Sequence, residues 1–281
     1  FLCVTFNGLL ISRTIIGPWQ RLNSLMDNAI AKFVPRDFLY LIKCRAITDV
    51  KLGSHMCCEA TVLALELRQH VKHVDQLIIN TSHARKSIKK QKSFGLITNN
   101  TSITTNTPMI HVLNKYFGFI GPIIRKHNGY IDKYLASSSG TGIMQPSCIA
   151  VFKRARNAIY AALELEKSVA IFNQDNPSVP AISILAGIHG DNCAILGTVG
   201  EDERMETAVI SNTAQIAMGI KRLTRQLKSK ILVSASTLKQ QSAKKLIDTK
   251  SRYVGKFSIG GNDTGSAFEI KVEELFSEQD P

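Results

Sequence analysis

A strand that passes directly into a helix is predicted between residues 197 and 224, where the residue types suit phosphate chemistry. Val209 and Ile210 end an apolar run, and Asn212 follows as a residue type that commonly caps the start of a helix. Beyond Asn212, apolar residues recur at helical spacing: Ala214, Ala217, Ile220 and Leu223. Backbone N–H groups at the start of a helix attract anions, so we expect this junction to suit a phosphate group.

The elements that must position this junction are predicted from apolar periodicity along the chain. Residues 182–188 and 194–199 form two apolar runs that predict two strands, and an acidic turn at 201–203 follows them. The other predicted strands are 61–68, 129–135, 231–234 and 267–272. The predicted helices are 13–32, 109–126, 155–172 and 237–247, while the polar tract 98–107 reads as a loop or a disordered segment.

Composition sets broad limits on the function. The chain has 281 residues, enough for one large domain with an extension, and its 44% hydrophobic content is that of an ordinary globular protein. Thirty-five Lys and Arg against 22 Asp and Glu give a net charge of +13, which favours an anionic partner or, equally, a solvated basic surface. The basic cluster at 85–92 lacks interleaved aromatic residues, so nucleic-acid binding has little support.

The N-terminal segment and the cysteines bear on location. Residues 1–12 are apolar but are followed by Arg13, whereas a membrane span needs about twenty apolar residues. The segment is therefore either the end of a membrane span or a buried strand or helix. The six cysteines show no metal-ligand spacing and are predicted to be reduced thiols in a cytoplasmic domain, with or without a membrane tether.

Several separated motifs give the chain a family likeness from about Phe33 to Ile270. They are Phe33-Val34-Pro35-Arg36-Asp37, Asp49-Val50-Lys51-Leu52-Gly53, His127-Asn128-Gly129-Tyr130, Phe172-Asn173, and Gly197-Thr198-Val199-Gly200 with Arg204-Met205 after it. In this order they resemble the class III adenylyl/guanylyl cyclase catalytic domain. The resemblance implies an α/β (α+β) fold with a ferredoxin-like βαββαβ core and helices packed on one face.

The same resemblance predicts the domain organisation and the reaction. Residues 1–32 are interpreted as an apolar segment with a linker helix, 33–60 as a connecting segment and 61–273 as the cyclase-homology domain. Members of the family convert ATP to cyclic AMP and pyrophosphate with Mg²⁺ or Mn²⁺, and they act as head-to-tail dimers. The implied partners are thus ATP or another nucleoside triphosphate and a second cyclase domain, identical or different.

Four nucleotide-contacting positions of the family map onto this chain. Lys133 matches the lysine that binds the adenine ring, and Ala208 stands at the base-selecting position. Gln215 stands where the family has the asparagine that orients the ribose, and Gly219 where it has the phosphate-binding arginine. Residues four apart share one face of a helix, so the family pair acts together over the ribose and the α-phosphate. Only Lys133 keeps the family residue.

The metal-binding positions are altered as well. Glu66 stands at the first metal carboxylate, and either Ser137 or Thr141 stands at the second, where no formal negative charge remains. Mg²⁺ requires near-octahedral geometry at about 2.0–2.1 Å, and the longer glutamate displaces the oxygen from the aspartate position. The alternative for Glu66 is a carboxylate without a role at the end of a strand.

These substitutions predict a cyclase-like domain with weak or no activity. Gly260 and Gly261 lie in the segment where the family has a late triphosphate lysine, so that charge is missing too. The alternative function is a catalytically silent dimerisation or regulatory partner of an intact cyclase. His189 is predicted to be structural.

Overall fold

The computed structural model describes residues 16–30, 34–69, 108–138, 144–201, 203–240, 249–260 and 267–277. The apolar segment 1–12, the basic cluster 85–92, the polar tract 98–107 and Thr141 lie outside these ranges.

The core follows the predicted βαββαβ order. It runs through β1 (His55–Gln69), α5 (Pro108–Lys126), β2 (Gly129–Ser138), β3 (Met144–Phe152), α6 (Ala155–Asp175) and β4 (Ile182–Gly200). The four strands stand in the order β2-β3-β1-β4, and each neighbouring pair is antiparallel. This arrangement is the ferredoxin-like core that the sequence predicts.

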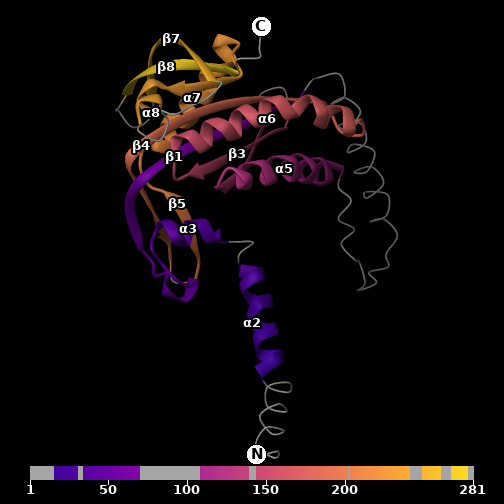
Figure 1. The fold of residues 1–281 in the computed structure, drawn as a ribbon, viewed down its shortest axis with the longest axis vertical. Coiled ribbons are helices and arrows are strands. Elements are labelled where there is room, and N and C mark those ends of the chain that lie inside the picture. Colours follow the sequence, from indigo (N-terminus) through magenta and orange to yellow (C-terminus); the bar gives the residue numbers. More distant parts are fainter. Residues whose placement is uncertain are drawn as a thin grey trace, which may run out of the picture.

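Alternate residues of β1 divide the core into two layers. Leu63 and Leu65 are buried in the cluster that contains the inner faces of α5 and α6, which lie side by side in Figure 1. Val62 and Ala64 are buried in a second cluster, which includes Ala217 of α7 (Thr213–Leu227). The helices of the βαββαβ core, α5 and α6, pack on one face as predicted, and α7, which follows the core in the chain, covers the opposite face.

The C-terminal part extends the sheet to eight strands. β5 (Met205–Val209) pairs with β4, and β6 (Ile231–Ser234) lies parallel to β4 on its other side. After α8 (Ala235–Lys239), β7 (Thr249–Gly260) and β8 (Ala267–Ser277) complete the order β6-β8-β7 at the edge.

Two predicted elements differ from the structure. The apolar runs 182–188 and 194–199 are one strand, because β4 continues through exposed residues between them. The helix predicted from Thr237 begins at Ala235 and ends at Lys239, since the extended backbone of Gln240 terminates it. Residues 241–248 lie outside the described ranges.

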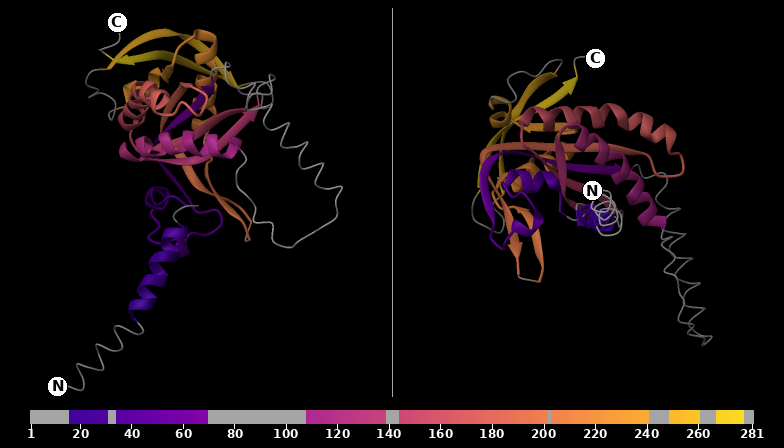
Figure 2. Two further views of the ribbon diagram at one scale, coloured as in Figure 1. Left: turned by 90° about the vertical axis from the view of Figure 1, so that its right-hand side faces the viewer. Right: turned by 60° about the horizontal axis from the view of Figure 1, so that its bottom comes forward.

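The N-terminal elements include a helix that stands away from the core. α2 (Gly17–Ile30) projects from the rest of the molecule in Figures 1 and 2, and Trp19 and Leu25 are exposed on it. α3 (Arg36–Leu41) and the short 3-10 helix η2 (Ile47–Asp49) follow, and Phe38 of α3 is buried in the core. None of the helices in the described part of the chain is both long and apolar enough to cross a membrane.

A disulfide joins Cys57 of β1 to Cys193 of β4, with the two Cα atoms 5.2 Å apart. The prediction of reduced thiols is therefore wrong for this pair. These residues are 136 positions apart in the sequence and meet only because β1 and β4 pair. Cys44, Cys58 and Cys148 are free thiols.

Candidate functional site

Helix α7 lies directly on the sheet where β4 has a glycine. A Cβ atom at Gly187 would lie 2.2 Å from the backbone nitrogen of Lys221 and 2.4 Å from the carbonyl oxygen of Ala217. Only a residue without a side chain permits this approach. The close contact carries the side chains of Lys221 and Arg225, one helical turn apart, across β4 toward β1.

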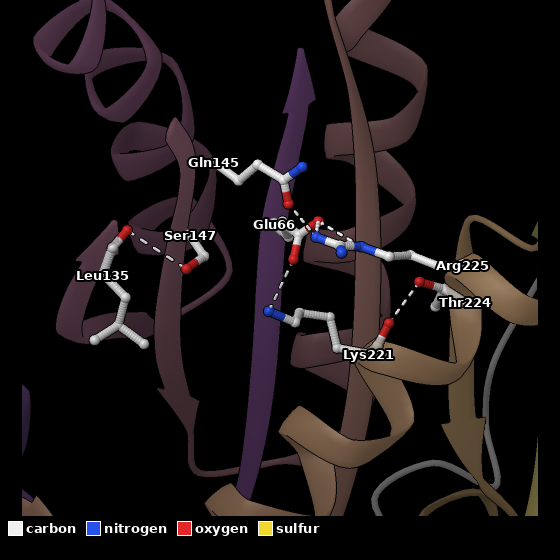
Figure 3. Close-up of polar contacts among 7 residues, drawn as sticks. All are labelled: Glu66, Leu135, Gln145, Ser147, Lys221, Thr224 and Arg225. Carbon is white, nitrogen blue, oxygen red and sulfur yellow. Dashed lines mark hydrogen bonds and ion pairs between the residues drawn. The ribbon is translucent and has the colours of Figure 1, made fainter. Parts of the chain in front are cut away.

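Glu66 of β1 is the buried acidic residue that these two cations meet. Its side chain is 3% exposed, and Lys221 Nζ lies 3.0 Å from Oε2. Arg225 donates to Oε1 through Nη2 at 2.5 Å and through Nε at 3.1 Å. Gln145 of β3 accepts a further hydrogen bond from Arg225, so the network spans α7, β1 and β3 (Figure 3).

Both carboxylate oxygens of Glu66 are therefore neutralised within the chain. An unpaired buried carboxylate would cost several kcal/mol, and breaking a buried ion pair by removing one partner costs about 3–5 kcal/mol. Glu66 is thus the anionic centre of this network.

The residues at the family's metal positions do not fit a divalent cation. Ser147 lies opposite Glu66 in the β1–β3 register, and Ser137 of β2 pairs with Gln145, so neither strand supplies a second carboxylate there. Within the described ranges, no group of three or more His, Cys, Asp or Glu side chains could hold a metal ion. Mg²⁺ favours several oxygen ligands with negative charge, whereas Glu66 already has two cationic partners.

The two α7 positions predicted to contact ribose and phosphate differ in exposure. Gln215 is exposed, while Gly219 is buried against Ile259 of β7. A Cβ atom at Gly219 would lie 2.1 Å from Ile259 Cγ2. A neighbouring strand thus occupies the space into which a side chain from residue 219 would project.

Lys133 borders a cavity of about 640 Å³ between β2, β5 and the N-terminal elements. Asp132, Glu206 and Thr207 also line it, together with the apolar residues Val34, Phe38, Ile47 and Val50. Thr207 donates a hydrogen bond to Asp132 at 3.0 Å. Burial raises the pKa of Asp132, and this hydrogen bond opposes the shift. Ala208 follows Thr207 on β5, so the structure brings Lys133 close to the strand of the predicted base-selecting position.

Lys221, Arg225 and Gln145 are the residues of this region that the sequence analysis missed. The sequence gives only a weak indication of Lys221 and Arg225, because two basic residues four positions apart on a helix are usually solvated. Lys221 projects from a different side of α7 than Gly219, which faces β7.

His189 occupies a buried polar site on β4. Its Nδ1 lies 2.8 Å from Ser234 Oγ, and Thr237 Oγ1 accepts a hydrogen bond from the backbone N–H of Gly190. Burial lowers the pKa of His189 to about 4, so the imidazole is neutral at physiological pH. These contacts support the structural role that the sequence analysis predicts for it.

The comparisons with known proteins agree on one kind of domain. No family model matches the chain. It is 24% identical over 267 residues to an adenylate cyclase of Anabaena cylindrica, covering 90% of this chain and 45% of that protein. It is 23% identical over 214 residues to the terminal-differentiation-specific adenylate cyclase of Dictyostelium discoideum, covering 76% of this chain and 9% of that protein. The chain thus spans less than half the length of these two relatives.

Solved structures show the same fold. A bacterial light-regulated adenylyl cyclase superposes with a TM-score of 0.60 at 16% identity, covering 95% of this chain and 65% of that one. The adenylyl cyclase CyaB from P. aeruginosa superposes with a TM-score of 0.53 at 17% identity, covering 79% of this chain and 96% of that one. The chain is therefore similar in sequence to parts of adenylate cyclases, and it has the fold of these solved adenylyl cyclase structures.

Proposed function

We propose that this chain is a cyclase-homology domain that does not cyclise nucleotides efficiently by itself and serves as a dimerisation or regulatory partner of an intact cyclase domain. The curated relatives are adenylate cyclases, which supports a role in cyclic-nucleotide signalling. Any residual reaction would convert ATP to cyclic AMP and pyrophosphate. A cytoplasmic position, with or without a membrane tether, belongs to the same proposal.

The observation that carries the proposal is the closed position at Gly219. In cyclisation the ribose 3′-hydroxyl attacks the α-phosphate, and the protein mainly positions these groups and neutralises charge. Each group that stabilises developing charge is commonly worth about a hundredfold or more in rate. Ile259 packs where a side chain from residue 219 would begin, so no phosphate-binding group can project from this point of α7.

A partner role needs a preserved fold more than an intact catalytic set. The sheet and α7 are well packed, and the cavity beside Lys133 keeps a basic residue where the resemblance implies contact with the base. In a head-to-tail dimer each domain supplies part of each site. A domain without its own metal and phosphate groups can therefore still complete or restrain the site of its partner.

The test is a cyclase assay with Mn²⁺ and ATP on the purified chain, alone and mixed with an intact cyclase domain. The Anabaena cylindrica relative is the first choice of partner. We expect no cyclic AMP above background from the chain alone, and a several-fold change in the partner's rate on mixing. The partner alone and the partner mixed with heat-unfolded chain are the controls.

Two outcomes contradict the proposal. If the lone chain makes cyclic AMP and a Gln215→Ala variant does not, the proposal that the chain lacks efficient catalysis is overturned. The variant shows that the activity does not come from a contaminating enzyme. An unchanged partner rate, together with no association in sedimentation at the assay concentrations, overturns the partner role.

A further inference from the structure

We propose that Lys221 and Arg225 are built-in counter-ions that replace a divalent metal ion at Glu66. The inference does not depend on the proposed partner role, because it concerns the charge balance of one buried carboxylate. The site is then not a metal centre that lacks a ligand. The positive charge beside Glu66 comes from the side chains of Lys221 and Arg225.

The charge balance around Glu66 opposes the binding of a metal ion. Glu66 carries one negative charge, whereas Lys221 and Arg225 together carry two positive charges and engage different carboxylate oxygens. A divalent cation at either oxygen would lie only a few ångströms from both cations. Repulsion between such charges is strong in a poorly solvated site. The group as a whole has a net charge of +1 and therefore repels a metal ion.

Access of a metal ion to the Glu66 carboxylate is restricted. The side chain of Glu66 is 3% exposed and that of Lys221 is 17% exposed. Mg²⁺ gives up its water molecules reluctantly and usually keeps several of them in a protein site. A hydrated ion cannot reach Oε2 unless Lys221 leaves, and a departing Lys221 must give up its ion pair.

The fold holds the two cationic side chains in place. Gly187 sets the distance between α7 and the sheet, and residues 221 and 225 project from the same side of the helix. Gln145 of β3 holds the guanidinium of Arg225 from the far side of β1 (Figure 3). The arrangement ties α7 to two strands, so it is a structural replacement for the metal.

The experiment measures Mn²⁺ binding by the loss of the free-ion signal in electron paramagnetic resonance, without nucleotide. Ser147 offers a matched design because it lies opposite Glu66, where Ser147→Asp would add a second carboxylate. We compare the wild type, Ser147→Asp alone, and Ser147→Asp combined with Lys221→Met and Arg225→Met. Each is also made with Glu66→Gln, which removes the carboxylate charge.

We expect no Glu66-dependent Mn²⁺ binding by the wild type. The variant with two carboxylates and no cations should bind Mn²⁺ at least tenfold more tightly than Ser147→Asp alone, and Glu66→Gln should abolish the gain. Far-ultraviolet circular dichroism reports whether each variant is folded.

Wild-type binding of Mn²⁺ that a folded Glu66→Gln variant lacks would overturn the inference. Equal Mn²⁺ affinity of the folded Ser147→Asp variant with and without the two cations would overturn it as well. Because metal binding is measured on the chain alone, a failed mixing assay contradicts the partner role and leaves this result unaffected.

Discussion

The backbone nitrogen of Lys221 lies 2.2 Å from the position that a Cβ atom of residue 187 would take. Among the glycines in the described part of the chain, Gly187 is the one at which β4 lies closest to α7. It sets the position of the whole helix, and through the helix it sets the ion pairs of Glu66.

Gly187→Ala should therefore push α7 away from the sheet. Overpacking of this kind typically costs about 1–3 kcal/mol, and here the obstacle is backbone, which cannot rotate aside. We expect the free energy of unfolding, measured by urea denaturation, to fall by at least that amount. Gly118→Ala is the control: its Cβ would meet nothing within 4 Å, and alanine in the middle of α5 should stabilise by about 0.5–1 kcal/mol. A Gly187→Ala protein as stable as the wild type would contradict the packing.

Gly219 and Ile259 should be energetically coupled. Gly219→Ala places a methyl group against Ile259 Cγ2, and Ile259→Ala removes that atom. We expect each single variant to lose stability, with about 2–4 kcal/mol for Ile259→Ala as a buried large-to-small change. The double variant should lose less stability than the sum of the two single-variant losses, by about 1 kcal/mol or more, because the added methyl group fills part of the cavity. Additive losses in urea denaturation would contradict the contact.

His189 should make the protein less stable in acid. Its folded pKa is about 4, below the unfolded value near 6.5, so the unfolded state binds more protons between these pH values. The neutral imidazole of His189 therefore contributes its full stabilisation above about pH 6.5. As the pH falls toward 4, the free energy of unfolding decreases by on the order of 3 kcal/mol in total.

The measurement compares urea denaturation of the wild type and His189→Gln at several pH values. The difference between the two curves should flatten above pH 6.5, since carboxylates that titrate in both proteins cancel. His111→Gln, at an exposed histidine of α5, is the matched control and should keep the wild-type dependence. A pH dependence unchanged in His189→Gln would contradict the burial of a neutral imidazole.

The disulfide between Cys57 and Cys193 should stabilise the domain. It closes a long loop of the unfolded chain, and such crosslinks typically contribute about 2–4 kcal/mol. Under non-reducing conditions we expect a Cys57→Ser/Cys193→Ser variant to unfold at lower urea concentration than the wild type, and we expect the wild type to approach the variant when it is reduced. Cys44→Ser should leave the transition in place, because Cys44 is a free thiol. Peptide mapping without reductant that finds both thiols free would contradict the pairing.

The sequence by itself determined much of the order of the elements, but its apolar pattern did not predict β3. Periodic apolar residues predict β1, α5, β2, α6 and the strand-to-helix passage into α7, because these patterns depend on neighbours within one element. The resemblance to the cyclase family also predicted which charged groups are missing, because glycine stands at position 219, where the resemblance implies an arginine.

Only the tertiary structure decided what fills the altered positions. Arg225 and Glu66 are 159 residues apart, and their ion pair depends on how closely α7 lies on the sheet at Gly187. The meeting of Ile259 with Gly219 and of Cys57 with Cys193 likewise depends on strands that are distant in the chain. Local patterns fix which face of a helix or strand is buried, whereas contacts between elements arise from packing that no local pattern encodes.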